Sequence, residues 1–213
     1  MDVSIYYLIL VFVITTSSMV LHELAHGIVA YWLGDDTAKN DGRLSLNPLK
    51  HIDPVMTIIL PLTLALVGGP IFGGAKPVPI NTRKLKWGEW GFALVAIAGP
   101  LTNFILAFIC FLIGHFSNTL MLSSSFLGIV TTAGMMINLG FMIFNLIPIP
   151  PLDGSRVLYA LAPDGFRDMM QKFEQVGLVV VLALVWIFGD AFSAYMTGAM
   201  AGVVSFFNLL VGA

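Results

Sequence analysis

Two histidines and a glutamate stand close together in an otherwise apolar stretch near the start of the chain. The stretch reads MVLHELAHGI, and His22, Glu23 and His26 fit the pattern His-Glu-x-x-His. Residues four apart on an α-helix lie on one face, one turn apart, so the two imidazoles can bind one metal ion. Glu23 lies near enough to accept a proton from a water on that metal, which is the arrangement of zinc hydrolases.

The apolar surroundings of this motif favour a functional role. Placing an ionisable group at membrane depth costs several kcal/mol, and such groups usually line a functional cavity. The alternative is that His22 and His26 hydrogen-bond to neighbouring helices while Glu23 is a buried ion-pair partner. The same apolar span contains no basic residue that could pair with Glu23. The pattern therefore predicts a metal site.

A catalytic zinc normally has three protein ligands and one open position. Asp153 is a candidate third ligand because it follows an apolar run in NLIPIPPLDGSR, where the prolines exclude regular helix. Gly154 permits a tight turn that could present this aspartate to a neighbouring helix. Asp153 could instead cap the helix that follows, and the residues alone leave both readings open. The other candidates for a third ligand are His51, Asp53, Glu89, Cys110, His115, Glu174 and Asp190.

The composition indicates an integral membrane protein. The 213 residues are 58% hydrophobic and 10% charged, whereas soluble domains are about 45–50% apolar and about 25% charged. Such a chain has too little polar surface to cover a water-soluble globule. The net charge of −2 gives no indication of a nucleic-acid partner. We expect one membrane-embedded metalloprotease domain over residues 1–213.

The apolar runs predict an all-α polytopic membrane protein, a bundle of about five to six transmembrane helices. The segment 54–69 contains Pro61 and either crosses once as a broken helix or dips into the membrane and returns. The Gly- and Pro-rich stretch after it predicts a short irregular or β-like loop near the active site. The clearer spans are expected over 3–33, 92–116 with an interruption at Gly99-Pro100, 126–147, 176–188 and 191–210.

The basic residues of the loops predict the orientation. The loops 75–89 and 151–173 contain lysine and arginine, whereas 117–125 contains neither. Because cytoplasmic loops carry an excess of Lys and Arg, the two basic loops should be cytoplasmic and 117–125 should face outside. We therefore expect a multi-pass protein of the cell membrane.

Two motifs in this order resemble the site-2 protease family of intramembrane zinc metalloproteases. They are His22-Glu23-x-x-His26 and NLIPIPPLDG, residues 145–154. The segments GRLSLNPLKHIDP, FGGAKPVPIN and AGPLTN are similar to the prokaryotic branch, so the likeness runs from about Val20 to Arg156. The chain has no room for the PDZ or nucleotide-sensing domains that gate substrate access in some members.

The resemblance implies one Zn²⁺ per chain, with Asp153 as the third ligand. It also implies a helical bundle whose site lies below the cytoplasmic face of a prokaryotic plasma membrane. Glu23 is then the general base. Asn145, and less so Asn103, are candidate donors to the oxyanion, although both amides could instead form hydrogen bonds between helices.

The substrate implied is a transmembrane protein helix within the lipid bilayer, which must unwind locally before attack. The loop GGAKPVPIN could pair with the unwound strand, or it could merely pack over the site. Two other functions compete: a metal or proton transporter that uses the buried His and Glu, and a non-catalytic binder of transmembrane helices. The sequence gives no indication of the oligomeric state.

Overall fold

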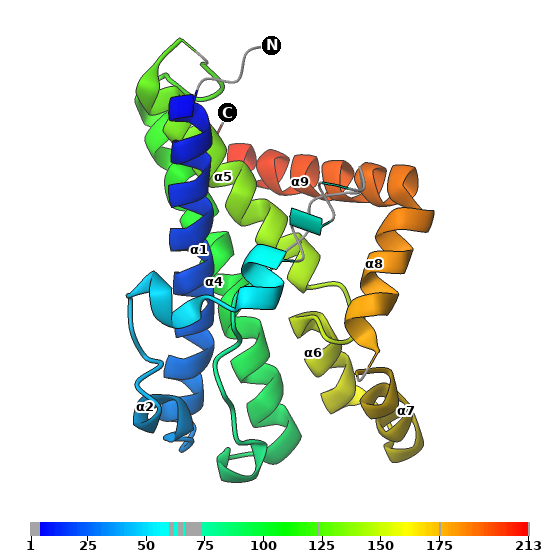
Figure 1. Ribbon diagram of the computed structural model, residues 1–213. Helices are drawn as coiled ribbons and strands as arrows, with labels where there is room; N and C mark the ends of the chain where they lie inside the picture. The colour runs from blue at the N-terminus through cyan, green and yellow to red at the C-terminus, as the bar shows by residue number, and fades with distance from the viewer. Residues whose placement is uncertain are drawn as a thin grey trace.

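The computed structural model describes residues 5–59, 62–63, 66, 74–122, 124–174 and 176–212, and most of these residues are helical (Figure 1). No strand occurs in this part of the chain. In chain order the elements are α1 (Ile5–Trp32), α2 (Thr37–Asn40), η1 (Pro48–His51), η2 (Pro54–Ile59), η3 (Thr82–Lys84), α4 (Gly88–Phe116), α5 (Phe126–Asn145), α6 (Asp153–Leu161), α7 (Asp164–Glu174), α8 (Gly177–Ile187) and α9 (Gly189–Val211).

Among the described residues, four helices are long and apolar enough to cross a membrane: α1, α4, α5 and α9. A fifth crossing is possible if α7 and α8, which meet at a bend of 79°, form one broken span. The prediction of an all-α polytopic membrane protein is confirmed. The protein is a multi-pass membrane protein, because several of its helices are apolar and long enough to cross the hydrocarbon core. Such helices also satisfy their own backbone hydrogen bonds inside the bilayer.

The expected interruption at Gly99-Pro100 is wrong, because α4 runs without a break through both residues. The expected segment 176–188 corresponds to α8, which begins and ends within one residue of the expected bounds. Its 11 residues rise about 16 Å, well short of the ~30 Å hydrocarbon core, so α8 alone does not span the membrane.

The segment 54–69 is described only in part. The structure shows the short π-helix η2 over its first six residues. Most of the remaining residues lie outside the described part of the chain, so the choice between a crossing and a dip stays a prediction.

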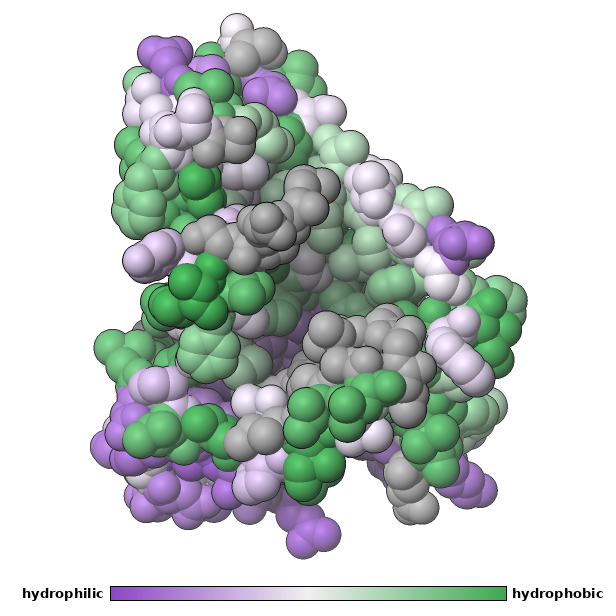
Figure 2. Space-filling model, turned by 45° about the horizontal axis from the view of Figure 1, so that its top comes forward, coloured by the Kyte–Doolittle hydropathy of each residue, from purple (hydrophilic) through white to green (hydrophobic). Residues whose placement is uncertain are grey.

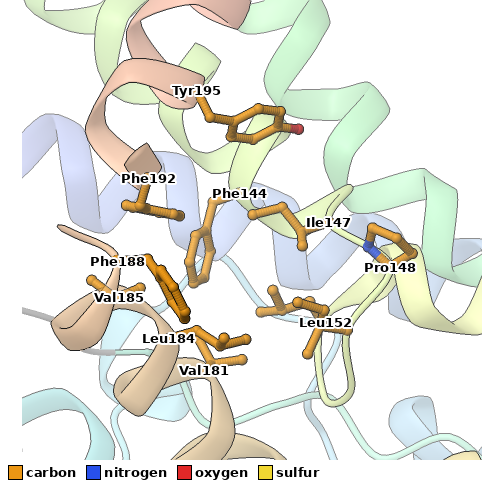
Figure 3. Close-up of a pocket in the computed structure, with 11 residues that line it drawn as sticks. Phe144, Ile147, Pro148, Leu152, Val181, Leu184, Val185, Phe188, Phe192 and Tyr195 are labelled. Carbon is orange, nitrogen blue, oxygen red and sulfur yellow. The ribbon is translucent and has the colours of Figure 1, made fainter. Parts of the chain in front are cut away.

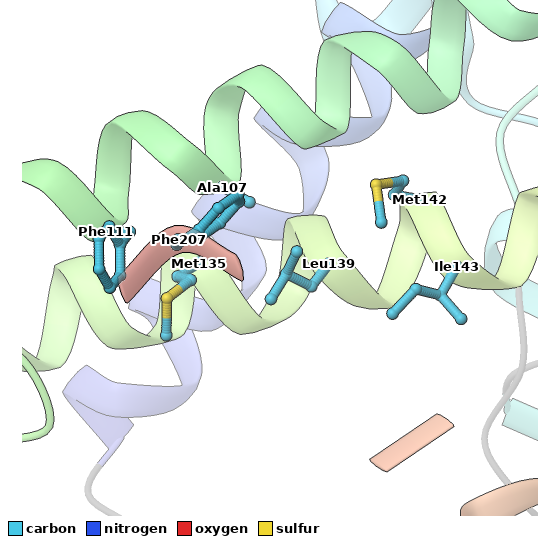
Figure 4. Packing of buried hydrophobic residues seen from close by; sticks show 7 residues of the cluster. All are labelled: Ala107, Phe111, Met135, Leu139, Met142, Ile143 and Phe207. Atoms are coloured by element: carbon cyan, nitrogen blue, oxygen red, sulfur yellow. The ribbon is translucent and has the colours of Figure 1, made fainter. Parts of the chain in front are cut away.

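The larger of two buried apolar clusters among the described residues joins α4, α5 and α9 (Figure 4). Gly134 of α5 faces Cys110 of α4 so closely that a Cβ would lie 2.7 Å from its Sγ. Phe207 inserts from α9 and is completely buried. Because lipid tails are as apolar as these side chains, such contacts stabilise the bundle through close packing. The buried cluster consists of Ala107, Phe111, Met135, Leu139, Met142, Ile143 and Phe207.

An apolar pocket of about 380 Å³ lies between the end of α5, the following turn, α8 and α9 (Figure 3). Phe144 and Leu152 approach it from one side, and Leu184 and Phe188 from the other. Its lining residues contain no His, Cys, Asp or Glu, so it does not belong to the predicted metal site.

The largest group of hydrophilic side chains in Figure 2 lies at one end of the molecule. Figure 2 shows hydrophilic side chains at its lower left, over the end at which Figure 1 places α2, while apolar side chains cover much of the flanks. The loop 117–125 lies at the opposite end of α4 from its start at Gly88. The basic loop 75–89 and the uncharged loop 117–125 are thus separated along α4.

The packing around Phe207 predicts a loss of stability on truncation. We expect Phe207→Ala to lower the free energy of unfolding in detergent by about 2 kcal/mol, less than the ~3–5 kcal/mol of aqueous cores, because the lipid-like solvent also favours the exposed ring. Thermal unfolding of the purified protein measures the loss. Leu209→Ala, on the same helix at 76% exposure, is the matched control and should change little; equal losses would contradict the packing argument.

Candidate active site

His22 and His26 lie one helical turn apart on the inner face of α1. Both are only 6% exposed, and their ring centroids are 4.6 Å apart. The Nε2 atoms of the two rings approach to 3.0 Å. The spacing read from the sequence therefore brings two imidazole nitrogens to one point inside the bundle.

Asp153 reaches the same point from far along the chain. It is the first residue of α6, and its Oδ2 atom lies 3.1 Å from His22 Nε2 and 3.3 Å from His26 Nε2. The turn before it folds tightly on itself: a Cβ on Gly154 would lie 2.2 Å from the Leu146 carbonyl oxygen. Glycine at 154 thus permits the turn that carries Asp153 to α1.

The outer nitrogen of each ring faces a hydrogen-bond acceptor. His22 Nδ1 lies 2.5 Å from Asn103 Oδ1, and His26 Nδ1 lies 2.7 Å from the Val95 carbonyl oxygen. In the neutral imidazole, Nδ1 therefore carries the proton in both rings, which leaves both Nε2 atoms as bare lone pairs. Asp153 Oδ2 is buried and has no hydrogen-bond partner, although both nitrogens are close to it. Three lone-pair atoms in contact repel one another unless a cation lies between them.

The backbone of α4 leaves room beside these atoms. A Cβ on Gly99 would lie 2.4 Å from His26 Nε2 and 2.5 Å from His22 Nε2. Only glycine keeps that space open, so the segment expected to break the helix instead forms one wall of the site. An orphaned carboxylate oxygen, two imidazole nitrogens and the open space fit Zn²⁺, which prefers such ligands and keeps a fourth position free in catalytic sites.

Glu23 lies beside the three candidate ligands and lines a cavity of about 250 Å³ together with His26 and Asp153. Its Oε2 accepts a hydrogen bond of 2.9 Å from the backbone N–H of Val78. Val78 belongs to the extended loop 74–81 and is 5% exposed. The loop therefore covers the cavity and holds the glutamate carboxylate.

Side chains from several elements hold the loop 74–81 in place. The Thr57 hydroxyl donates to the Gly74 carbonyl at 2.6 Å, and Arg43 donates to the Lys76 carbonyl at 2.8 Å. At the other end, the buried Asp35 accepts the N–H of Asn81 at 2.6 Å.

The segment just beyond this loop is also fixed to the end of α1. The Lys84 ammonium donates to Asp36 at 2.5 Å, and this hydrogen bond lowers the pKa of the Asp36 carboxyl. Loop 74–81 is thus supported on both sides of Val78.

Arg156 is a cavity residue that the sequence analysis missed. It follows Asp153 by three residues, so the two share one face of α6, and this spacing was the available signal. Its guanidinium pairs with Glu174 of α7 and lies 5.1 Å from the centre of the Phe92 ring. A compensated positive charge therefore borders the cavity.

The two asparagines expected near the oxyanion lie in different places. Asn103 is completely buried and contacts His22 through its carbonyl oxygen. Asn145 does not line the cavity; its amide donates to the Phe141 carbonyl in its own helix at 3.0 Å. A role for Asn145 at the oxyanion stays a prediction. It requires the Asn145 amide to leave the Phe141 carbonyl and donate to the substrate oxyanion instead.

The remaining candidate ligands lie elsewhere. Within the described residues, His22, His26 and Asp153 form the one group of three or more His, Cys, Asp or Glu side chains whose ligand atoms meet closely enough for a metal ion. His51, for example, is buried, but its Nε2 lies 2.8 Å from the Ser45 carbonyl oxygen.

The chain is similar to known zinc metalloproteases. The model of Peptidase family M50 matches residues 119–188. The chain is 43% identical over 183 residues to the candidate zinc metalloprotease YwhC of Bacillus subtilis, covering 84% of this chain and 79% of that one. It is also 36% identical over 154 residues to the candidate zinc metalloprotease MJ0611 of Methanocaldococcus jannaschii, covering 70% and 71%.

A more distant relative is longer than this chain. The candidate zinc metalloprotease Rip2 of Mycolicibacterium smegmatis is 31% identical over 174 residues, which cover 79% of this chain and 63% of Rip2. No solved structure matches. Because the likeness to YwhC extends over most of both chains, the protein belongs to peptidase family M50, the site-2 protease family, and is a membrane-embedded zinc metalloprotease.

Proposed function

We propose that the protein is an intramembrane endopeptidase that hydrolyses peptide bonds in or near the transmembrane helices of membrane proteins. The observation that carries the proposal is the meeting of His22, His26 and Asp153 beside a cavity that also contains Glu23. The motif stands on α1, a helix long and apolar enough to span the bilayer. Peptide bonds delivered to this cavity are therefore those of a membrane-embedded substrate.

In the proposed site, the Nε2 atoms of His22 and His26 and the Oδ2 atom of Asp153 would hold one Zn²⁺. When bound there, zinc polarises a carbonyl and lowers the pKa of a coordinated water to about 7. The Glu23 carboxylate accepts the proton of the attacking water and passes it to the leaving amine. His22 and His26 are each only 6% exposed, and electrostatic interactions are stronger in such a buried setting than in water.

The loop 74–81 offers a place for an unwound substrate. A helical substrate hides its carbonyls in internal hydrogen bonds, so the scissile segment must become extended before attack. Pro77, Val78 and Ile80 line the cavity, and an extended peptide can add to exposed backbone by strand pairing. We propose that the loop receives the substrate in this way.

The charge distribution supports a cytoplasmic site. The basic loop 75–89 and the uncharged loop 117–125 are separated along α4. By the excess of Lys and Arg on the cytoplasmic side, the end with loop 75–89 faces the cytoplasm. The cavity is lined by part of this same loop, so water enters from that side.

The two competing functions find less support. A transporter of this kind should show inverted repeats, whereas His22, His26 and Asp153 meet at one candidate metal position. A non-catalytic binder has no need of a base, yet Glu23 is held beside the ligands.

Substitution of the base should separate binding from catalysis. We expect Glu23→Gln to retain one zinc per chain but to lose about 10²–10⁴-fold in cleavage of a transmembrane substrate in liposomes, because the amide cannot accept the proton. His22→Ala and Asp153→Ala should lose the zinc as well. Elemental analysis and cleavage assays measure the two effects.

Several results of that experiment would contradict the proposal. Cleavage that persists in Glu23→Gln would rule out the base. Zinc that remains in His22→Ala and Asp153→Ala would rule out the ligand set. Metal flux in liposomes without any proteolysis would favour the transporter.

Loss of the Val78 amide should impair the reaction without removing zinc. We expect Val78→Pro to lower kcat/KM by about 10–100-fold, because a hydrogen bond to a charged group contributes about 1.5–3 kcal/mol. Val78→Ile keeps the N–H and is the matched control. Since Pro77 and Pro79 already flank this position, the backbone tolerates proline nearby. Normal cleavage by Val78→Pro would argue against both substrate pairing and support of Glu23 by this amide.

A further inference from the structure

A chain of buried polar side chains links three membrane-spanning helices behind the site. Asn103 of α4 lies 2.5 Å from His22 of α1, and its Nδ2 donates to Asn138 Oδ1 of α5 at 2.8 Å. Asn138 Nδ2 in turn lies 2.9 Å from Ser18 Oγ and 2.8 Å from the Gly134 carbonyl oxygen. Asn103 is 0% exposed, Asn138 3% and Ser18 4%.

The direction of donation along this chain is fixed at its far end. The Gly134 carbonyl can only accept a hydrogen bond, so it must face the NH2 group of Asn138 rather than the amide oxygen. Asn138 therefore presents its amide oxygen to Asn103, and the NH2 group of Asn103 donates to that oxygen. The oxygen of Asn103 is then left to face His22 Nδ1.

The last link acts on the ring of His22. An oxygen next to Nδ1 requires the proton to stand on Nδ1, which leaves the Nε2 lone pair free toward His26 and Asp153. With the Asn103 amide reversed, an NH2 group would face Nδ1, and the proton would shift to Nε2. His22 in that form cannot bind a metal ion through Nε2.

We propose that Asn138 is a positioning residue that sets the metal-binding tautomer of His22 through Asn103. Asn138 itself contacts neither His22 nor the candidate metal position; the backbone carbonyl of Gly134 orients it, and it orients Asn103. The inference rests on the proposed ligand set. Partners that orient a metal-bound histidine typically contribute 10–100-fold to metal affinity.

A purely structural role of the network makes a different prediction. Polar amides between membrane helices also stabilise the bundle through hydrogen bonds. In that case loss of Asn138 would lower the stability of the bundle without a specific effect on zinc affinity, and fixing the tautomer of His22 by other means would not help. A carboxylate at 103 separates the two roles, because its oxygens can only accept and need no partner to orient them.

The experiment measures zinc affinity of the purified full chain in detergent by competition with a chelator. Asn138→Leu should bind zinc about 10–100-fold more weakly than the wild type. The double variant Asn103→Asp with Asn138→Leu should return to near the wild-type affinity. Thr131→Val is the matched control. It removes a buried hydroxyl of α5 that donates within its own helix at 2.9 Å, and it should leave zinc affinity unchanged.

Unchanged zinc affinity in Asn138→Leu overturns the inference, and so does a double variant as weak as the single one. A loss of equal size in Thr131→Val also overturns it, because the effect is then general to the packing of α5. His22→Ala is measured alongside. Undiminished zinc affinity in that variant would show that the proposed ligand set itself is wrong.

Discussion

The structure depends on one constraint: three lone-pair atoms are held in contact inside an apolar bundle. His22 Nε2, His26 Nε2 and Asp153 Oδ2 lie within 3.3 Å of one another. Without a cation these atoms repel, and in low dielectric that repulsion is strong. The surrounding fold serves to hold them together: α1 supplies two atoms, the tight turn before α6 supplies the third, and α4 leaves room at Gly99.

The sequence predicted the parts of the site that depend on local spacing. The helical repeat places His22 and His26 on one face whatever the rest of the fold does, and the adjacent glutamate follows from the same geometry. Asp153 was ambiguous from its own residues, because a proline-rich turn before a helix suits both a ligand and a cap. The structure brings it to the two imidazoles, a contact across more than half of the chain that no local pattern encodes.

Other features could not be predicted because tertiary packing reverses a local preference. Gly99-Pro100 reads as a helix break, yet α4 continues through both residues, and the glycine is needed for the close approach of α1. The amide of Val78 carries no signal in its side chain, since any residue but proline supplies an N–H. Asn103 was identified as a polar residue in a span, but its partners on two other helices appear only in three dimensions.

The flanking prolines of Val78 have a consequence for how a peptide is received. Proline has no amide hydrogen, so Val78 supplies the single backbone donor across residues 77–79, and Glu23 already occupies it. A peptide strand that takes this hydrogen must displace the carboxylate. As long as Glu23 keeps this hydrogen, residues 77–79 can meet an extended peptide only as acceptors, through their carbonyl oxygens.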